Sequence, residues 1–430
     1  MRITAKFKKK FYFVAAGYFR FFANHALKRW NPRIIAITGS VGKTTMLHLI
    51  EAELKGRAHY SHDANSAFGI AFDLVNLRGV TGSKLRWLYL IFAAPIKCLF
   101  VKHKEPFYIV EIDGERPHET EFLATWLKPE VTLWVSLGRS HAVQYEQQIR
   151  DGVFESLDKA ITHEFATLPE NTKKAIYIDG DVKMMVKATD KILKKKKTNA
   201  TVYKFYKKDL KKYEIFHDKT TFKLKSGKEF EFNEPMPKDI AIQLLMLESL
   251  MDYLNVDVRT DLNDMVVAPG RNSFFEGKND LKIIDSSYNA HLISVRSILE
   301  MSKEMPEKKK WLIIGDMVEQ GFIEGDEHAK LADLIADAKP DKVILVGRRT
   351  KKYTYPRLKE FGINAETFGD VKPALKYIEK NTKGGEVLIF KGSQYLEWII
   401  EKLLKNPEDA EKLPRREKAA TKRREKRGLN

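Results

Sequence analysis

The stretch Ile34–Thr45 reads IIAITGSVGKTT, and it decides the fold of the region that contains it. Its first four residues are apolar, as in a buried strand, and a glycine-rich turn follows and ends in Lys43. Backbone N–H groups of such a turn cradle phosphate oxygens, Lys43 neutralises the β- and γ-phosphates, and Thr44 can bind Mg²⁺. We therefore expect a nucleoside triphosphate to lie against the loop residues Thr38, Gly39, Ser40, Val41, Gly42, Lys43, Thr44 and Thr45.

The spacing of this loop narrows its class. A general phosphate loop has four residues between its first glycine and the Gly-Lys pair, which would require glycine at position 37. The chain has Ile37, so the loop is a shorter form that reads Thr-Gly-x-x-Gly-Lys-Thr-Thr. A chance cluster of Gly, Lys and Thr is the alternative, and the apolar residues on both sides of the loop argue against it.

Length and composition indicate a folded protein of enzyme size. The 430 residues suggest two or three domains, and a hydrophobic content of 43% suffices for their cores. The single cysteine, Cys98, excludes an internal disulfide and a zinc site built on cysteines. We expect a cytoplasmic protein in which Cys98 is a core residue.

Short apolar runs alternate with helical segments, which predicts an α/β fold. The strand-like runs are residues 108–112, 131–135, 175–178, 281–285, 311–315, 342–347 and 386–390. We expect a P-loop-type central ATPase domain with a mostly parallel sheet, followed by a smaller Rossmann-like C-terminal domain. The expected divisions are residues 1–30 (a basic aromatic helix), 31–268 (the central ATP-binding domain), 269–407 (the C-terminal domain) and 408–430 (a disordered basic tail).

The formal net charge of +18 is spread unevenly along the chain. Residues 1–33 hold nine Lys or Arg and no acid, around the aromatic run 11–22. Because this run is too short to span a bilayer and contains Arg20, a helix lying on a surface fits it better. Two interpretations stay open: contact of residues 1–30 with the inner membrane surface, or packing of this helix on the nucleotide domain. The apolar stretch 85–101 contains two basic residues and a proline, so we expect a buried or interfacial helix there.

Two further basic segments have a simpler interpretation. Residues 191–225 carry thirteen Lys and three acids, which is typical of a solvated strand surface. The segment after Glu408 is nearly free of apolar residues, which predicts disorder. Since neither segment contains an RNA-binding motif, we expect no specific nucleic acid partner.

Several short motifs follow the phosphate loop in a fixed order. They are Asn65–Ile70 (NSAFGI), Val110–Asp113 (VEID), Lys128–His141, Pro269–Arg271 (PGR), Asp285–Ala290 (DSSYNA), Gly315–Gly321 (GDMVEQG) and Lys391–Ser393 (KGS). Together with the loop, this order resembles the Mur ligase family, and within it the members that add D-Ala-D-Ala to a muramoyl-tripeptide. The resemblance runs from residue 34 to about residue 404.

The resemblance implies an ATP-dependent carbon–nitrogen ligase of peptidoglycan precursor synthesis, with ATP and Mg²⁺ as cofactors. ATP would phosphorylate the carboxylate of a muramoyl-peptide acceptor, and an amino acid or dipeptide amine would attack the acyl phosphate. Lys43, His141 and Arg271 would be catalytic. Thr44, Glu111 and His141 would hold metal ions.

The resemblance also implies roles for residues of the second domain. Arg271 would reach the γ-phosphate, Asp285 the ribose hydroxyls, and Asn289 would lie close to the nucleotide. A separate set would bind the substrates: Asn65, Lys391 and Ser393. Asp316 and Glu319 fit helix caps as well as site residues, and we assign them no catalytic role.

The chain departs from the family pattern in three places. The family's carbamylated lysine has no counterpart in register, because Ile161 stands there and Lys159 is two residues away. The segment that would hold the nucleotide base reads differently at residues 237–241. Only about thirty residues precede the ATP loop, so we do not expect the family's N-terminal uridine-nucleotide domain.

These departures keep three alternatives open. The acceptor could be lipid-linked and presented at the inner membrane surface. The acceptor could instead be an acid that is not a cell-wall precursor, such as a folate-like compound or an amino-acid polymer. In the third alternative the chain is a degenerate ligase that serves as a nucleotide-binding scaffold.

Overall fold

The computed structural model describes residues 2–62, 64–79, 83–393 and 395–429, and it divides the chain into two compact units. The first unit comprises Met1–Leu137 and Gln147–Phe205. The second comprises Gly138–Glu146 and Tyr206–Asn430.

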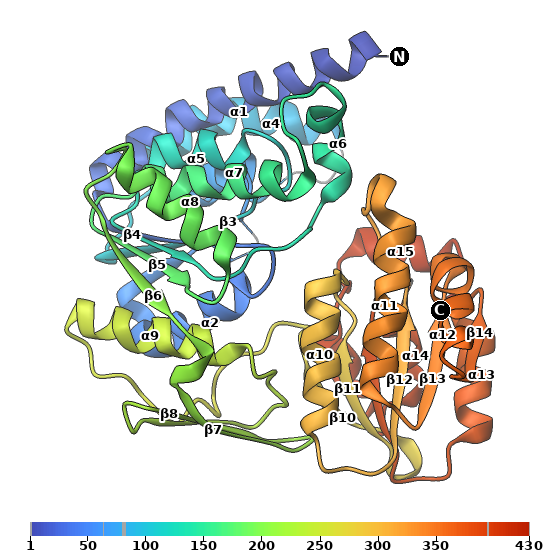
Figure 1. Ribbon diagram of the computed structural model, residues 1–430. Coiled ribbons are helices and arrows are strands. Elements are labelled where there is room, and N and C mark those ends of the chain that lie inside the picture. Colours follow the sequence, from blue (N-terminus) through green and yellow to red (C-terminus); the bar gives the residue numbers. More distant parts are fainter. Residues whose placement is uncertain (1, 63, 80–82, 394, 430) are drawn as a thin grey trace. The chain divides into compact units, whose positions relative to one another are not determined.

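The first unit is built on a six-stranded parallel sheet with the order β2-β3-β1-β4-β5-β6 (Figure 1). Its strands are β1 (Arg33–Thr38), β2 (Ala58–Tyr60), β3 (Phe107–Ile112), β4 (Val131–Trp134), β5 (Ala175–Asp179) and β6 (Thr201–Phe205). Both faces of a parallel sheet are covered, so its inner strands read as continuous apolar runs. β1 lies between β3 and β4 and is buried from Ile34 onward, which places the loop after it at the carboxyl edge of the sheet.

Helices cover this sheet. They are α1 (Arg2–Trp30), α2 (Lys43–Leu54), α3 (Ala67–Leu74), α4 (Lys84–Phe100), α5 (Glu119–Leu127), α7 (Leu157–Glu170) and α8 (Lys183–Lys194), with η1 (Lys55–Arg57), while α6 (Ala142–Arg150) crosses the boundary between the units. One core cluster joins α1, α3, α4 and α5 to β1 and β3, and Phe19, Ala23 and Leu27 of α1 are buried in it. The N-terminal helix is therefore part of the folded unit.

The second unit contains a six-stranded sheet with the order β10-β11-β15-β12-β13-β14, in which only β10 runs antiparallel to its neighbour. Its strands are β10 (Ser273–Glu276), β11 (Lys282–Ser286), β12 (Lys310–Gly315), β13 (Lys342–Val346), β14 (Ala365–Phe368) and β15 (Val387–Lys391). One core cluster packs α10 (Leu292–Glu304), α11 (Glu324–Ala338) and α12 (Tyr355–Glu360) on one face, and another packs α13 (Val371–Asn381) and α14 (Leu396–Leu403) on the other. The unit is doubly wound, as the alternating pattern predicts.

The second unit also contains a smaller antiparallel sheet and several short helical elements. A three-stranded antiparallel sheet contains β7 (Leu210–Ile215), β8 (Thr220–Leu224) and β9 (Glu229–Phe232), and α9 (Ile240–Leu254) follows it. Short helical turns are η2 (Lys207–Asp209), η3 (Lys278–Asp280), η4 (Gly321–Ile323), η5 (Thr350–Thr354) and η6 (Pro407–Lys412), and α15 (Lys418–Glu425) is the final helix.

The structure confirms the α/β class, the parallel central sheet and the Rossmann-like second sheet. The prediction of a disordered tail after residue 408 is wrong, because η6 and α15 occupy this segment. Two of its few apolar residues, Leu413 and Leu429, are buried in the core of the second unit. Arg416 and Arg424 both donate to Glu401 of α14 at 2.6 Å. A few buried leucines and paired arginines thus dock a segment whose composition alone indicates disorder.

The apolar stretch 85–101 forms α4, with Cys98 buried and several large apolar residues exposed. This is the buried or interfacial helix that the sequence predicts. Among the residues that the structure describes, no helix is both long and apolar enough to span a bilayer.

Candidate functional site

Glycine is required at the first turn of the phosphate loop. Gly39 has a φ of 140°, and a Cβ atom there would lie 2.8 Å from the backbone nitrogen and oxygen of Ser136. Gly42 has a φ of 83° and caps the start of α2 in a left-handed conformation. Both angles are costly for residues with a Cβ atom. The loop therefore turns sharply enough to direct its N–H groups and the start of α2 toward one point.

Ser136 holds the loop in this shape. Its hydroxyl accepts a hydrogen bond from the Val41 N–H at 2.9 Å and donates to the Val41 carbonyl at 2.7 Å. Its carbonyl accepts from the Ser40 N–H at 3.4 Å. Ser136 is not among the predicted residues. It stands two residues after β4, and β4 pairs with β1, the strand that leads into the loop, so its place in the sequence could have indicated this role.

Lys43 is buried at the base of the loop. Its Nζ donates to the Gly39 carbonyl at 2.8 Å and lies 3.4 Å from Oδ1 of Asp113. A buried ammonium group with a single carboxylate at this distance can bind an additional anion such as a phosphate. This geometry suits the role that the sequence predicts for Lys43.

Oxygen ligands for a divalent cation gather beside the loop. The Thr44 hydroxyl donates to Oε2 of Glu111 at 2.7 Å, and the Glu111 N–H donates to the hydroxyl of Ser61 at 2.9 Å. Oδ1 of Asp113 is buried and makes no hydrogen bond, while the Asp113 N–H donates to the carbonyl of Asn65 at 3.0 Å. Hydroxyl and carboxylate oxygens are the ligands that Mg²⁺ prefers, so these residues fit the ion.

The structure adds Asp113 to the predicted pair Thr44 and Glu111. The signal in the sequence is that Asp113 stands two residues after Glu111, where β3 ends. Asn65 also lies near these groups, through the bond of its carbonyl to Asp113.

His141, the predicted second metal ligand, belongs to the second unit. Its Nδ1 lies 2.6 Å from Oε2 of Glu319, and its ring centroid lies 5.8 Å from that of His291. Its φ is 51°, which is uncommon for a residue other than glycine. Glu319, which the sequence analysis left without a catalytic role, is thus the partner of His141. Asp316 acts as a cap, because its Oδ1 accepts from the Thr350 N–H at 2.9 Å.

Asp285 and Lys391 stand near the ends of the neighbouring strands β11 and β15. These strands pair Ser286 with Lys391, and Lys391 Nζ donates to the Ser286 hydroxyl at 3.3 Å. Burial raises the pKa of Asp285 to about 6 against the opposing hydrogen bond from the Ser287 N–H. Burial and then the charge of Arg271 lower the pKa of Lys391 to about 7, while Asp285 opposes this shift. Perturbed pKa values at the carboxyl ends of parallel strands are typical of functional sites.

Polar atoms around this pair lack hydrogen-bond partners. Among the described residues, Oδ2 of Asp285 and the hydroxyls of Ser287 and Ser393 are buried without one. Arg271 lies with its guanidinium 4.8 Å from the centre of the Tyr288 ring. A ligand with hydroxyl or anionic groups would satisfy these atoms.

The remaining predicted residues of the second unit differ in exposure. Asn289 is exposed, one residue after Tyr288. Ser393 follows Gly392, whose φ is 143° and whose Cβ atom, if present, would lie 2.4 Å from the backbone nitrogen of Gly315. The ends of β12 and β15 thus approach closely, and the Ser393 N–H donates to the Asp316 carbonyl at 3.2 Å.

The C-terminal segment contributes an arginine that the sequence analysis missed. Arg415 donates to the Ser287 carbonyl at 3.2 Å and to Oε2 of Glu397 at 3.1 Å, and it also donates to the Tyr288 carbonyl. Burial raises the pKa of Glu397, while the charge of Arg415 opposes that shift. The tail therefore packs against the loop that carries Ser287, Tyr288 and Asn289.

Lys159 lies in α7, where its Nζ pairs with the exposed carboxylate of Glu155, while Ile161 is buried. The exposed Lys159 therefore does not occupy the buried position that Ile161 fills. Residues 237–241 lie at the start of α9.

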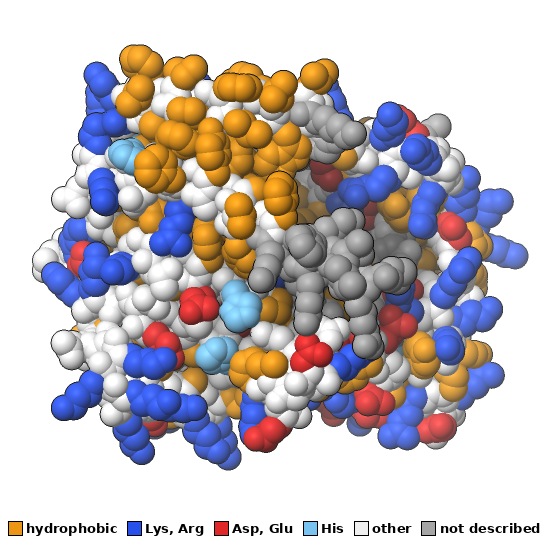
Figure 2. Space-filling model, turned by 90° about the horizontal axis from the view of Figure 1, so that it is seen from above, with side chains coloured by type: hydrophobic (Ala, Val, Ile, Leu, Met, Phe, Trp, Pro, Cys, Tyr) orange, Lys and Arg blue, Asp and Glu red, His pale blue; other side chains and the backbone are white. Residues whose placement is uncertain are grey.

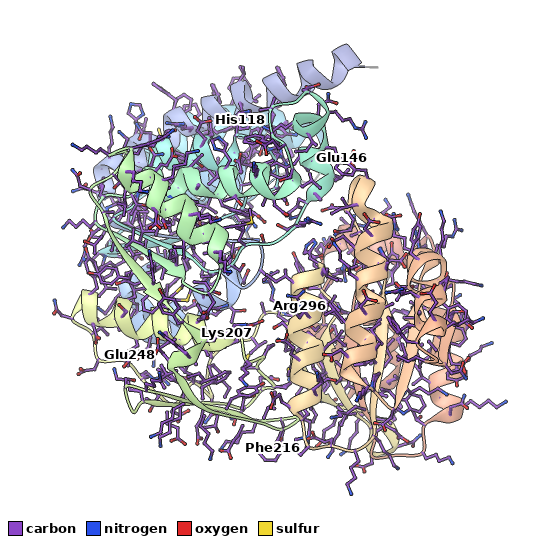
Figure 3. All side chains as sticks on the ribbon, in the orientation of Figure 1. His118, Glu146, Lys207, Phe216, Glu248 and Arg296 are labelled. Carbon is purple, nitrogen blue, oxygen red and sulfur yellow. The ribbon has the colours of Figure 1, made fainter. Side chains whose placement is uncertain are left out.

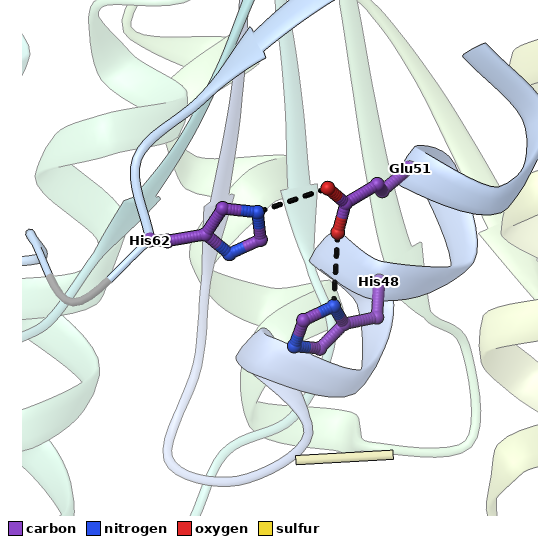
Figure 4. A group of neighbouring side chains, drawn as sticks. All are labelled: His48, Glu51 and His62. Atoms are coloured by element: carbon purple, nitrogen blue, oxygen red, sulfur yellow. Dashed lines mark hydrogen bonds and ion pairs between the residues drawn. The ribbon is translucent and has the colours of Figure 1, made fainter. Parts of the chain in front are cut away.

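A second candidate metal-binding cluster lies on α2 and after β2 (Figure 4). Nδ1 of His48 lies 3.0 Å from Oε2 of Glu51, and Nε2 of His62 lies 3.0 Å from Oε1 of the same carboxylate. The two imidazole rings stack with centroids 5.3 Å apart. The sequence analysis missed this cluster, although the spacing of His48 and Glu51 by three residues places them on one face of a helix.

Comparison with known proteins shows similarity to the Mur ligases. Residues 270–394 match the family model described as Mur ligase, glutamate ligase domain. Over 388 residues the chain is 23% identical to the UDP-N-acetylmuramoyl-tripeptide–D-alanyl-D-alanine ligase of Bacillus subtilis. The matched region covers 89% of this chain and 78% of the relative. Residues 270–394 match a Mur ligase domain, and most of the chain is similar to a MurF-type ligase. This similarity agrees with the resemblance that the order of the motifs predicts.

Other similarities point to the same group of ligases. A segment of 162 residues is 30% identical to the ligase of the same name from Rickettsia prowazekii, covering 37% of this chain and 35% of the relative. The fold matches that of MurF from Thermotoga maritima in complex with ADP, with a TM-score of 0.69, 17% identity and coverage of 95% of this chain and 84% of that one. MurF from Acinetobacter baumannii gives a TM-score of 0.67 at 17% identity, covering 90% and 79% of the two chains.

Proposed function

We propose that this protein is an ATP-dependent carbon–nitrogen ligase that acts in peptidoglycan precursor synthesis. The observation that carries the proposal is the phosphate loop: buried Lys43 stands at the base of a turn that Gly39 forces, beside the oxygen ligands Thr44, Glu111 and Asp113. The match of residues 270–394 to a Mur ligase domain and the similarity to ligases of the MurF type support the reaction class.

The chemistry transfers one phosphoryl group and then forms one amide. A carboxylate oxygen of the acceptor attacks the γ-phosphorus of ATP, which gives an acyl phosphate and ADP; the amine then attacks the acyl carbon and phosphate leaves. Such a transfer depends on positioning and on positive charge near the phosphoryl oxygens. Lys43 supplies that charge from a fixed position, and the N–H groups at the start of α2 bind the anionic oxygens. Mg²⁺ held by Thr44, Glu111 and Asp113 would neutralise further negative charge on the phosphates.

The second unit carries proposed roles toward the same substrates. Arg271 is proposed to contact the γ-phosphate, Asp285 the ribose hydroxyls, and Asn289 the nucleotide. The buried acceptor on Asp285 and its shared environment with Lys391 support ligand binding at this edge. Ser393 and Lys391 are proposed to bind the carboxylate of the amine substrate, and His141 a second metal ion.

The substrates that we propose first are those in the names of the relatives, a UDP-linked muramoyl-tripeptide and D-alanyl-D-alanine. A lipid-linked muramoyl-peptide at the inner membrane surface is the second candidate for the acceptor. The exposed apolar side chains of α1 and α4 favour it. A degenerate scaffold that only binds nucleotide is disfavoured, because Lys43 stays in the loop and the candidate metal ligands Thr44 and Glu111 stay in contact.

The test is phosphate release from ATP and Mg²⁺ by the purified protein, with each acceptor offered with and without D-alanyl-D-alanine. We expect release that requires both acceptor and amine, with a loss of 100-fold or more in Lys43→Ala. Lys102→Ala, a change outside the site, is the control. Release that is equal in Lys43→Ala and in the unaltered protein would overturn the proposal.

A further inference from the structure

Two helices of the first unit expose large apolar side chains. On α1 these are Phe11, Val14, Tyr18 and Phe21, and on α4 they are Leu85, Leu88, Tyr89, Ile91, Phe92, Ile96, Leu99 and Phe100. Their exposed fractions range from 37% to 80%. We call this set the apolar face, and Figure 2 shows orange side chains gathered where these helices lie. Soluble proteins rarely expose so many neighbouring apolar groups unless they form a binding surface.

The spacing shows that the apolar face is a regular feature of α1. Its four exposed residues recur at intervals of three, four and three, which places them on one side of the helix. Phe19 and Ala23 lie on another side and are buried in the core. Because packing in the core requires only one apolar side, the second apolar side is available for a partner.

Hydrogen bonds join the two helices. The Tyr18 hydroxyl donates to the Ile91 carbonyl at 2.8 Å, and Arg29 donates to the carbonyls of Cys98 and Val101 at 2.8 and 2.7 Å. These contacts fix α1 and α4 side by side. The exposed residues of both helices therefore act as one surface.

A groove of about 530 Å³ opens in this surface. It is lined by Phe11, Tyr12, Ala15, Tyr18, Phe19, Phe68, Trp87 and Ile91. The hydroxyls of its two tyrosines are already bonded, Tyr12 to Glu119 at 2.6 Å and Tyr18 to the Ile91 carbonyl. The groove thus offers a ligand carbon surfaces, which suit a hydrocarbon chain.

The two sequence segments that carry the apolar face are basic. Residues 1–33 contain nine Lys or Arg and no acid, and residues 74–104 contain six and no acid. An anionic surface complements this distribution. Two copies of the same face would repel each other, so a symmetric dimer through it is disfavoured.

We propose that the apolar face docks on an anionic phospholipid bilayer and that the groove takes up one acyl chain. Helices with an apolar side and basic flanks lie in the plane of a membrane interface, at the level of the headgroups.

The first experiment is flotation of the full-length protein, without substrates, on vesicles of phosphatidylcholine with 30% phosphatidylglycerol. We expect Phe21→Glu with Phe92→Glu to lower the partition coefficient at least tenfold, and neutral vesicles or 0.5 M salt to lower it as well. The matched control is Phe216→Glu, because Phe216 is 50% exposed in the turn after β7 and is labelled in Figure 3.

Two results would overturn membrane docking. One is equal flotation of the double variant and the control. The other is a protein that forms dimers in solution, binds no vesicles and becomes monomeric in the double variant, which would make the face an interface between copies. Neither readout needs ATP, so failure here is distinct from failure of the proposed ligase activity.

The groove is tested with brominated acyl chains, which quench tryptophan fluorescence on contact. Trp87 lines the groove, so we expect vesicles of brominated phosphatidylglycerol to quench part of the emission, and this part to be missing in Trp87→Phe. Quenching of the same size in Trp87→Phe would show that no chain enters the groove.

A second inference concerns the cluster of His48, Glu51 and His62. We propose that these side chains bind a divalent transition-metal ion of the Zn²⁺ type. Their ligand atoms all lie within 4.8 Å of one another. Ligands of a tetrahedral zinc ion stand about 2.0–2.1 Å from the metal, which puts them roughly 3.3 Å apart. The two N–O distances of 3.0 Å are near that spacing, and imidazole nitrogen and carboxylate oxygen are both zinc ligands.

The test is a titration of the protein with Co²⁺ alone, followed by visible absorption, and displacement of Co²⁺ by Zn²⁺. We expect Co²⁺ to bind at this cluster, with its affinity reduced at least 100-fold in His62→Ala and in Glu51→Gln. His163→Ala, an exposed histidine on α7, should bind as the unaltered protein does. Binding that is the same in His62→Ala and His163→Ala would overturn the site.

Discussion

At the scale of single residues, Lys391 makes stability depend on pH. Its pKa in the folded protein is about 7, whereas an unfolded chain keeps the proton up to about 10.5. Between these values the unfolded state binds more protons, so stability rises with pH, by up to about 1.4 kcal/mol per unit. Urea unfolding from pH 7.5 to 9.5 should show this slope, and Lys391→Met should reduce it. The exposed Lys376→Met is the control, and parallel slopes in all three proteins would contradict the assignment.

Asp285 has the opposite dependence. Its pKa is raised by burial to about 6, so its contribution to stability is present below the unfolded value near 4 and is lost as the pH rises through 6. Asp285→Asn removes the buried charge and keeps the acceptor for the Ser287 N–H. We expect this variant to unfold at higher urea than the unaltered protein at pH 8 and to bind ADP at least tenfold more weakly in calorimetry. A variant that is less stable at pH 8 and binds ADP normally would refute both parts.

At the scale of elements, the turn between β1 and α2 tolerates only glycine at its first position. Gly39→Ala would place a Cβ atom 2.8 Å from the backbone of Ser136 at a φ of 140°. We expect a loss of about 2–3 kcal/mol in the free energy of unfolding, since a strained backbone adds to the clash, and no measurable ATP binding. Gly56→Ala is the control, because that glycine has open space around it. Equal stability of the two variants would argue against the strained turn.

Glu401 of α14 contributes to the docking of the C-terminal tail that ends in α15. Burial would raise the pKa of Glu401, but hydrogen bonds from Arg416 and Arg424 outweigh it and lower the pKa. The ion pairs therefore stabilise the tail above about pH 4 and are lost as the pH falls through the lowered value. We expect Glu401→Gln to speed trypsin cleavage within residues 415–427 about tenfold at pH 7.5. The control is Glu408→Gln at an exposed position, which should leave the cleavage rate unchanged. An unchanged cleavage rate in Glu401→Gln would mean that the tail docks by its leucines alone.

At the scale of the whole molecule, ligand binding should stabilise the folded state by mass action. At a free nucleotide concentration 100 times Kd the gain is about 2.7 kcal/mol for one site. We expect ATP with Mg²⁺ to raise the midpoint of thermal unfolding in the unaltered protein and in Lys102→Ala, and to leave Lys43→Ala unchanged. A shift of equal size in Lys43→Ala would mean that the nucleotide binds elsewhere.

The sequence by itself determined the phosphate loop, the alternation of strands and helices, and the basic aromatic helix at the start. These features follow from short-range patterns: apolar periodicity, glycine positions and the spacing of charges. The loop pattern therefore makes Lys43 and Thr44 candidates for the site, and the family resemblance adds Glu111 at the end of a strand.

Only the tertiary structure decided which distant residues complete each site. Ser136 holds Val41 from 95 positions away, and Arg415 reaches Ser287 across 128 positions. The groove between α1 and α4 and the pairing of His62 with Glu51 likewise depend on the path of the chain. Local patterns carry no information on these contacts, because they exist only once buried strands and helices have brought remote segments together.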